Sequence, residues 1–199
     1  MDRGRRAVFL DRDGVLNEAT VRDGVPHPPE TLRDLVVVPG VDDACRALKR
    51  AGLVLVMVTN QPDLARGTAT PAAVHAMNKS LQRRLGLDDV FMCPHDDADD
   101  CPCRKPRPGL LLEAAARWNV WLDGSVMVGD RWRDIEAGRR AGCATVLVRR
   151  DSAERSTVIP DRVVDTLGDA VPWILHSVVG VPEENYVCNA LGAPGQDLR

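Results

Sequence analysis

The sequence predicts an α/β fold of three layers, in which helices cover both faces of a mainly parallel sheet. Short apolar runs alternate along the chain with segments whose apolar residues recur at helical spacing. The run at 53–58 is continuous Val, Leu and Met, which is typical of a parallel strand buried on both faces. Repeated strand–helix units of this kind build parallel sheets with helices on either side.

The expected elements follow in chain order. A strand at 7–10 leads into a polar, proline-containing loop from 18 to about 33, and a second short β-type run occupies 35–38. A helix that starts at Val41 should end at Gly52, because glycine suits the position after a helix C-terminus. The remaining expected elements are strands at 53–58, 90–92, 125–128, 144–148 and 163–164, and helices at 71–85, 108–118, 131–141 and 167–178. Together they predict a Rossmann-like sheet.

Bulk properties limit the function classes. The 199 residues fit one domain, and 44% hydrophobic with 28% charged residues is ordinary globular composition. A net charge of −3 gives no general attraction to nucleic acid or to anionic membranes. Apolar stretches are too short for a membrane span or a signal peptide. We therefore expect a cytoplasmic protein, and a monomer, since no apolar surface stripe is left over.

One domain should occupy 1–182, followed by a tail at 183–199 that is polar and contains glycine and proline. The intervals between the segments described below leave no room for a large inserted cap domain.

Polar residues follow three of the expected strands at the point where each strand ends. They are Asp11 and Asp13, then Thr59 and Asn60, then Asp130 and Asp134. In an open α/β sheet the carboxyl ends of the strands meet at one edge, where ligands bind. Clustered carboxylates repel one another unless a cation lies between them, and carboxylate with phosphate oxygen is the ligand set of Mg²⁺. One of two neighbouring acids can serve as nucleophile while the other moves protons.

A fixed positive charge for phosphoryl oxygens can come from Arg104-Lys105-Pro106, in which the proline restricts Lys105 to extended backbone. Each feature alone has a simpler explanation. Thr59 could cap a strand, Lys105 could be a solvated surface lysine, and Asp130 with Asp134 could cap a helix. Their occurrence together and in this order favours a phosphoryl-transfer site.

The segments LDRDG, TN, RKP and GDRWRD, in this order, resemble the four motifs of the haloacid dehalogenase (HAD) superfamily of phosphohydrolases, over roughly residues 6–176. The resemblance implies a HAD-like fold and assigns roles by position. Asp11 is the nucleophile, and Asp13 protonates the leaving oxygen and then deprotonates water. Thr59 and Lys105 bind the phosphoryl group. Asp11, the backbone carbonyl of Asp13, and Asp130 hold Mg²⁺.

Two close pairs of ligands, Cys93-x-His95 and Cys101-x-Cys103, match a tetrahedral Zn²⁺ site. A disulfide or unrelated surface cysteines are the alternatives. Because Arg104 follows directly, bound zinc should fix the position of the active-site cations. The other cysteines have no second cysteine or histidine close by in the sequence. Cys45 and Cys143 are expected as small buried hydrophobic residues, and Cys188 lies in the tail.

The zinc loop beside RKP is similar to two groups within the superfamily, the heptose 1,7-bisphosphate 7-phosphatases and the histidinol-phosphate phosphatases. TNQPDLARG, RKPRPGLLL and VLVR favour the heptose group, whereas the five-residue zinc spacer is the form of the histidinol-phosphate group. The resemblance implies that Arg104 and Asn60 contact substrate, and Arg131 is a further candidate. The loop at 18–33 departs from the family, so Arg22 and His27 are weaker candidates.

The sequence thus predicts a Mg²⁺-dependent phosphomonoester hydrolase that forms an aspartyl-phosphate and acts on a heptose bisphosphate or a similar small sugar phosphate. The alternatives are histidinol-phosphate hydrolysis, removal of 3′-phosphates from nucleic acid, and a catalytically silent binding module. The acidic charge balance disfavours nucleic acid as a partner. The presence of every reactive residue disfavours a silent module.

Overall fold

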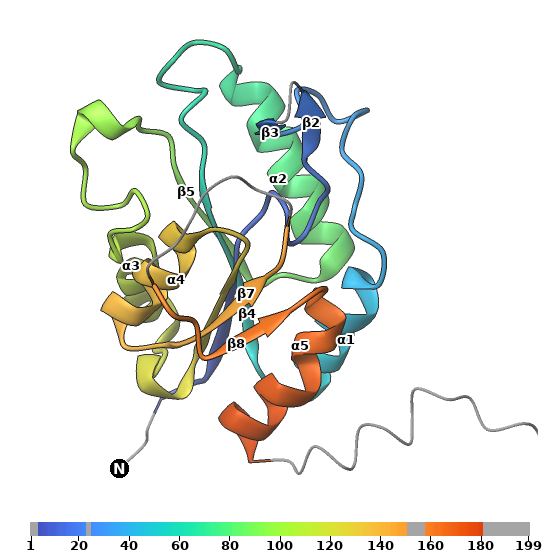
Figure 1. Cartoon of the computed structure of the whole chain (residues 1–199), viewed down its shortest axis with the longest axis vertical. Helices are drawn as coiled ribbons and strands as arrows, with labels where there is room; N and C mark the ends of the chain where they lie inside the picture. The colour runs from blue at the N-terminus through green and yellow to red at the C-terminus, as the bar shows by residue number, and fades with distance from the viewer. Residues whose placement is uncertain (1–3, 23–24, 151–157, 181–199) are drawn as a thin grey trace, which may run out of the picture.

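The computed structural model describes residues 4–22, 25–150 and 158–180. A six-stranded, wholly parallel sheet forms its centre (Figure 1). In spatial order its strands are β5 (Asp89–Cys93), β4 (Val54–Asn60), β1 (Ala7–Leu10), β6 (Val126–Gly129), β7 (Ala144–Val148) and β8 (Arg162–Val164). The chain builds outward from β1 first on one side and then on the other. The carboxyl end of β1 therefore lies where the strand order reverses, which is where open α/β sheets bind ligands.

Two helical layers cover the sheet, which confirms the predicted fold class. One face packs against α1 (Val41–Arg50), α2 (Pro71–Leu85) and α5 (Leu167–Ile174), and the other packs against α3 (Gly109–Trp118) and α4 (Trp132–Ala141). Successive strand residues point to opposite faces. Val8 and Leu10 accordingly lie in the core beneath α1 and α5, and Ala7 and Phe9 lie in the core beneath α3 and α4.

Local signals explain where the helices begin and end. The Thr70 hydroxyl accepts a hydrogen bond from the Ala73 amide at 3.2 Å, and Pro71 occupies the first turn of α2, where it loses no helical hydrogen bond. Gly142 ends α4 with φ of 84°, a left-handed conformation that glycine adopts without strain.

The structure corrects two expectations in the segment after β1. The predicted loop at 18–33 contains an antiparallel hairpin, β2 (Thr20–Arg22) and β3 (Val25–His27). The β-type run at 35–38 is not a strand of the sheet. It makes only an isolated bridge between Asn17 and Val37. Its backbone pairs with residues 16–18 instead, and this pairing places Val38 in the core.

The ends of other strands and helices differ from the predicted ends by a few residues. Strand β4 continues through Asn60, and a short 3-10 helix, η1 (Asp97–Asp99), lies within the otherwise irregular segment at 93–107. The last predicted helix is α-helical only to Ile174 and ends in a π turn, η3 (Leu175–Val179). Residues 181–199 lie outside the described part, so the tail, Cys188 and the domain boundary at 182 stay predictions. No helix within the described residues has the length and apolarity that a membrane crossing requires.

Candidate active site

The carboxyl ends of β1, β4 and β6 lie side by side and open into a pocket of about 330 Å³. The sequence predicts that these strand ends meet at one edge of the sheet, and the observed strand order places them there. The pocket contains most of the residues expected from the sequence. These are Asp11, Asp13, Thr59, Asn60, Arg104, Lys105 and Arg131, with Asp134 beside them. Asp130 does not line this pocket, but its carboxylate has an oxygen within 4.8 Å of the carboxylate oxygens of Asp11 and Asp134.

Lys105 is the buried cation of the site, with 2% of its surface exposed. Its Nζ donates to Asp11 Oδ1 and to the Val58 carbonyl, both at 2.8 Å, and pairs with Asp134 Oδ1 at 2.6 Å. Burial alone would lower the pKa of this amine, but the carboxylates of Asp11 and Asp134 outweigh burial and raise it. Lys105 is therefore a permanent positive charge beside the expected nucleophile.

Asn60 fixes the backbone of Lys105. Its side-chain amide donates to the Lys105 carbonyl at 3.0 Å, and its Oδ1 accepts from the Lys105 amide at 3.1 Å. Asn60 was expected to contact substrate. The structure places it at the pocket wall, where its side-chain amide is bound to the backbone of Lys105. Thr59 is buried beside it, and its hydroxyl accepts a hydrogen bond from Gln61 at 2.9 Å.

Three carboxylates, those of Asp11, Asp130 and Asp134, have oxygens within 4.8 Å of one another. Burial and the charge of Asp134 raise the pKa of Asp11 to about 6, although Lys105 opposes the shift. Burial, together with Asp11 and Asp134, raises the pKa of Asp130 to about 8. One Lys105 ammonium does not balance three carboxylates, so a further cation would stabilise the ionised group.

The donor set fits Mg²⁺. The Asp130 Oδ1 atom is buried and has no hydrogen-bond partner among the described residues. An unsatisfied buried oxygen is costly, and a hard cation with oxygen ligands would satisfy it. Gly14 packs against the Asp130 carboxylate. Its φ is 85°, and a Cβ at this position would lie 2.3 Å from Asp130 Oδ2. The predicted metal ligands Asp11 and Asp130 thus lie together, and Asp134 is a third carboxylate that the predicted ligand set lacked.

The side chain of Asp13 turns away from this carboxylate cluster. Its oxygens accept hydrogen bonds from Arg12, Asn17 and Gln61 at 2.9–3.2 Å. About 20% of its surface remains exposed, on the pocket side. This arrangement is compatible with the predicted division of roles, in which the carboxyl of Asp13 moves protons and only its backbone carbonyl binds metal.

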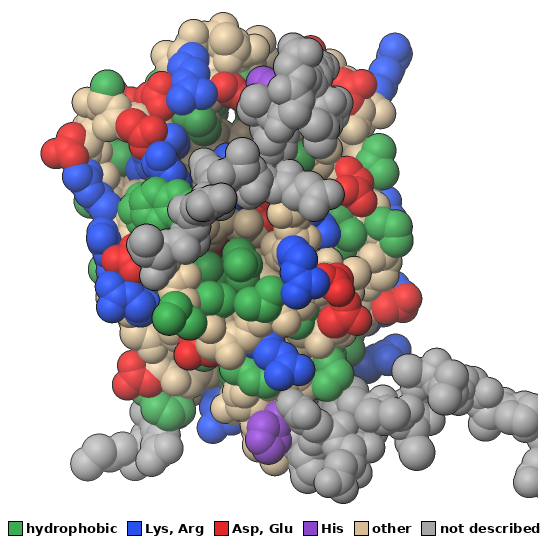
Figure 2. All heavy atoms as spheres, in the orientation of Figure 1, with side chains coloured by type: hydrophobic (Ala, Val, Ile, Leu, Met, Phe, Trp, Pro, Cys, Tyr) green, Lys and Arg blue, Asp and Glu red, His purple; other side chains and the backbone are tan. Residues whose placement is uncertain are grey.

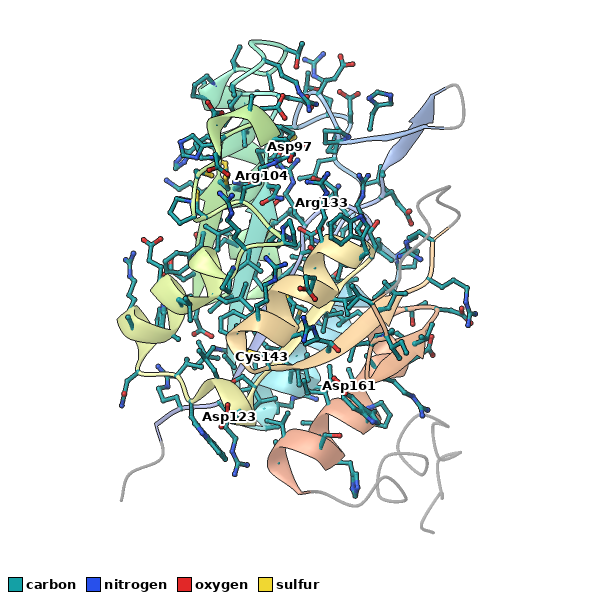
Figure 3. The ribbon with its side chains drawn as sticks, turned by 60° about the vertical axis from the view of Figure 1, so that its left-hand side comes forward. Asp97, Arg104, Asp123, Arg133, Cys143 and Asp161 are labelled. Atoms are coloured by element: carbon teal, nitrogen blue, oxygen red, sulfur yellow. The ribbon has the colours of Figure 1, made fainter. Side chains whose placement is uncertain are left out.

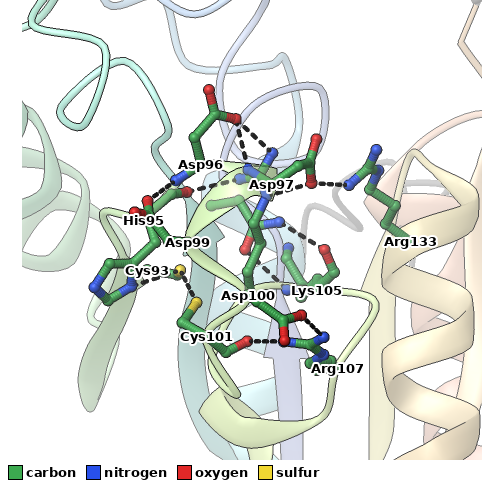
Figure 4. A network of polar contacts seen from close by, with 12 residues as sticks. Cys93, His95, Asp96, Asp97, Asp99, Asp100, Cys101, Lys105, Arg107 and Arg133 are labelled. Atoms are coloured by element: carbon green, nitrogen blue, oxygen red, sulfur yellow. Dashed lines mark hydrogen bonds and ion pairs between the residues drawn. The ribbon is translucent and has the colours of Figure 1, made fainter.

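The four predicted zinc ligands converge, with one ligand atom from each within 4.8 Å of the others; Figure 4 labels Cys93, His95 and Cys101. The Cys93 Sγ lies 3.5 Å from His95 Nδ1 and from Cys101 Sγ, and Cys103 Sγ lies 3.2–3.4 Å from the other three ligand atoms. Bonds of about 2.3 Å to zinc would give a tetrahedron with edges of roughly 3.7 Å, so a slight expansion of this cage admits the ion. These sulfur and imidazole donors fit zinc. Cys45 and Cys143 are buried, as expected.

Arginines line the mouth of the pocket. Arg104 donates to Asp97 Oδ1 at 2.8 Å, and Arg133, from the first turn of α4, donates to the same oxygen at 2.8 Å (Figures 3 and 4). Both arginines lower the pKa of Asp97. Arg66 pairs with Asp96 at 2.6 Å, and Arg131 completes the row. Anionic substrate groups would meet several guanidinium donors here.

Sequence reasoning missed Arg133, Arg66, Gln61 and Arg12. All four stand inside segments quoted above: Arg12 in LDRDG, Gln61 and Arg66 in TNQPDLARG, and Arg133 in GDRWRD. Their positions in the same segments as residues with assigned roles were the signal that could have identified them. His27 lies at the pocket mouth and is exposed, whereas the side chain of Arg22 is outside what the structure describes. Figure 3 shows Cys143 far from the pocket arginines, in agreement with a structural role.

Comparisons with known proteins agree with this geometry. Residues 102–170 match the HAD-hydrolase-like family model. The chain is 34% identical over 198 residues to the D-glycero-beta-D-manno-heptose-1,7-bisphosphate 7-phosphatase of Bordetella bronchiseptica, with 97% of each chain covered. It is 37% identical to the D-glycero-D-manno-heptose-1,7-bisphosphate 7-phosphatase of Thermosynechococcus vestitus, over 85% of this chain and 95% of the relative.

Among solved structures, the fold is similar to the D,D-heptose 1,7-bisphosphate phosphatase of B. bronchiseptica in complex with magnesium and phosphate. The TM-score is 0.75 at 34% identity, and the match covers 86% of this chain and 98% of the other.

Proposed function

This chain belongs to the HAD family of phosphatases, and we propose that it removes the 7-phosphate of D-glycero-D-manno-heptose 1,7-bisphosphate or of a closely similar sugar phosphate. The observation that carries the proposal is the contact of Lys105 Nζ with Asp11 Oδ1 at 2.8 Å within a cluster of three carboxylates. A nucleophile, a fixed cation and a cation site in one pocket are the parts that phosphoryl transfer requires.

In the first step, the free oxygen of Asp11 attacks phosphorus, and the bond from phosphorus to the sugar oxygen breaks. Lys105 neutralises charge on the phosphoryl oxygens, and Thr59 donates a hydrogen bond to them. Asp13 gives a proton to the departing sugar oxygen. Mg²⁺, held by Asp11, Asp130 and the Asp13 carbonyl, would supply charge neutralisation for the transferring group.

In the second step, the phosphoryl group is on Asp11, and Asp13 has lost its proton. Asp13 accepts a proton from a water molecule, whose oxygen then attacks phosphorus. The bond between phosphorus and Asp11 breaks, which releases inorganic phosphate and restores the carboxylate. Asp13 reaches water from its exposed pocket side. The same carboxyl therefore acts first as acid and then as base.

Substrate preference rests on the arginines at the mouth. A bisphosphate keeps one phosphate that is not hydrolysed, and this anion needs donors beyond the catalytic cluster. Arg104, Arg131 and Arg133 line the pocket at that place. The two heptose bisphosphate phosphatases reported above support this choice over histidinol phosphate, which carries a single phosphate and a cationic end.

We further propose structural Zn²⁺ at the four-ligand cage, a monomeric state and a cytoplasmic location. Within the described residues, the exposed large hydrophobic side chains are Leu32, Val36, Leu112, Ile159 and Val163. The face drawn in Figure 2 carries acidic and basic side chains side by side, with no region of one sign. This mixed charge supports a small-molecule substrate and argues against nucleic acid or a membrane as partner.

The test is a comparison of kcat/KM for heptose 1,7-bisphosphate, histidinol phosphate and a 3′-phosphorylated oligonucleotide, by phosphate release with Mg²⁺ present. We expect the heptose bisphosphate to exceed the others by at least about tenfold. Asp11→Asn is the matched control, since it keeps the shape of the side chain and removes the nucleophile. It should lose activity by on the order of a thousandfold or more while remaining folded. A preference for either other substrate would overturn the proposed specificity, and an active Asp11→Asn would overturn the covalent route.

A further inference from the structure

Directly beneath the proton-transfer residue lies a guanidinium with no exposed surface. Arg12 is 0% exposed and is the largest fully buried side chain among the described residues. Its Nε lies 3.1–3.2 Å from both oxygens of Asp13, and its Nη2 lies 3.0 Å from Asp13 Oδ2. Together with the amides of Asn17 and Gln61, this guanidinium therefore orients the Asp13 carboxylate.

Two neutral amides hold the other side of the guanidinium. Arg12 Nη2 donates to Gln61 Oε1 at 2.9 Å, and Arg12 Nη1 donates to Asn78 Oδ1 at 3.0 Å. Gln61 then donates from its own amide to Asp13 and to Thr59, each at 2.9 Å. The network thus joins the phosphoryl-binding hydroxyl, the proton-transfer carboxylate and a helix.

Asn78 is the member that lies outside the pocket. It stands in the middle of α2, is 6% exposed and is not among the residues that line the pocket. An asparagine in the interior of a helix has low intrinsic helix propensity, and burying its amide is costly without partners. The Asn78 Oδ1 accepts a hydrogen bond from Arg12, which offsets this cost. The Asn78 Nδ2 makes a long contact of 3.7 Å to Met92 Sδ.

We propose that Asn78 is a positioning residue for proton transfer. It acts through Arg12. The hydrogen bond from Arg12 to Asn78 fixes the plane of the guanidinium, and the guanidinium holds the Asp13 carboxyl toward the leaving oxygen. Without the Asn78 oxygen, Nη1 of Arg12 is buried and unpaired, and the guanidinium can turn toward other acceptors. Asp13 then keeps its hydrogen bonds from Asn17 and Gln61, but the charged donor among its three partners is no longer fixed in place. This inference rests on the proposed function only in that the chain is a phosphatase whose Asp13 protonates the leaving group.

The role has a specific kinetic signature. A correctly placed general acid contributes about 10²- to 10⁴-fold when the leaving oxygen needs a proton. An alkyl phosphate such as glycerol phosphate has such a leaving group. p-Nitrophenyl phosphate does not, because nitrophenolate departs without protonation. Loss of Asn78 should therefore impair the alkyl ester much more than the aryl ester.

The experiment compares kcat/KM for these two esters in the wild type and in Asn78→Leu, with Mg²⁺ present. We expect kcat/KM for glycerol phosphate to fall at least about tenfold and that for p-nitrophenyl phosphate to fall less than about threefold. The ratio of the two values, measured on one sample, does not depend on the fraction of enzyme that is folded. Lys79→Ala is the matched control, since Lys79 is the next residue of α2 and is exposed. It should leave the ratio unchanged.

If Asn78→Leu does not fold, Asn78→Ser keeps a small acceptor and should give a smaller fall in the same ratio. Equal losses on both esters, or no loss on either, would overturn the role of Asn78 and leave the proposed function intact. A wild-type enzyme that releases phosphate neither from heptose 1,7-bisphosphate nor from these two esters would overturn the proposed function as well.

Discussion

The carboxyl of Asp130 indicates a cation site through its surroundings alone. This carboxyl is buried near Asp11 and Asp134, and its pKa is raised to about 8, well above the value near 3.9 of an unfolded chain. Between these two pH values the folded protein without metal binds more protons than the unfolded protein. The free energy of unfolding must therefore fall as pH rises through this window. Below pH 4 this contribution is fully present.

We accordingly predict that metal-free protein melts at lower temperature at pH 8 than at pH 6. Mg²⁺ should raise Tm more at pH 8, because the bound cation favours the ionised carboxylates. One pKa unit corresponds to about 1.4 kcal/mol, and 1 kcal/mol shifts Tm by roughly 2–4 °C in a chain of this size. Thermal melts in EDTA and in Mg²⁺ measure both effects.

Asp130→Asn is the control for other titrating groups. It removes the charge and keeps the shape, so it should lose most of the Mg²⁺ response and melt with less dependence on pH. A wild type with the same Tm at both pH values, and no response to Mg²⁺, would contradict the cation site.

For single residues, the sequence predicted which residues form the site better than it predicted their hydrogen-bond partners. The motif positions of Asp11, Asp13, Thr59 and Lys105 placed all four at one pocket. The partners of each side chain depended on contacts between elements, and these were not predictable. Asn60, expected to contact substrate, lines the pocket, and its bonds to the Lys105 backbone were not foreseen.

Among the elements, the loop between β5 and α3 has the least regular structure and carries the most function. It contains the four-ligand cage, the Asp97 that two arginines contact, and Lys105. Such a loop buries little apolar surface, so its shape depends on the metal cage and on ion pairs. A bound zinc ion should therefore fix the catalytic cation indirectly.

We predict that purified protein contains about one equivalent of zinc and that Cys103→Ser loses it. Because Arg104 and Lys105 follow directly, kcat/KM should fall about 10- to 100-fold. Elemental analysis and steady-state kinetics measure the two quantities. Cys143→Ala is the control: Cys143 is buried and distant from the pocket, so this variant should keep both zinc and activity. Full activity in a zinc-free Cys103→Ser would refute the stabilising role of the cage.

The segment after β1 was predicted least well. Its polar, proline-containing composition indicated a loop, and the hairpin of β2 and β3 has too few residues to produce a clear alternating pattern. The apolar run at 35–38 had the composition of a strand, but it pairs with no strand of the parallel sheet. Its backbone pairs with residues 16–18. Tertiary competition, and not local propensity, decided this segment.

For the whole molecule, stability depends on the two cores on either side of the sheet. Phe9 is the large side chain of the central strand β1, is 0% exposed and packs beneath α3 and α4. We predict that Phe9→Ala lowers the free energy of unfolding by about 3–5 kcal/mol, a large part of the roughly 5–15 kcal/mol typical of a domain. Urea denaturation measures the change.

Leu112→Ala serves as the comparison, since Leu112 on α3 is 47% exposed. Its cost should stay within about 0.5 kcal/mol. A Phe9→Ala variant that lost less than about 1 kcal/mol would show that the core around β1 collapses without penalty, contrary to the packing described here.

The sequence by itself determined the alternation of strands and helices, the parallel sheet and the residues at the strand ends, because these follow from local periodicity and motif order. Only the tertiary structure decided which side chains contact one another. The network from Asn78 through Arg12 to Asp13, the third carboxylate Asp134 and the paired arginines around Asp97 join residues from separate elements. Hydrogen bonds and ion pairs depend on distances of a few ångströms in space, and separation along a chain does not specify them.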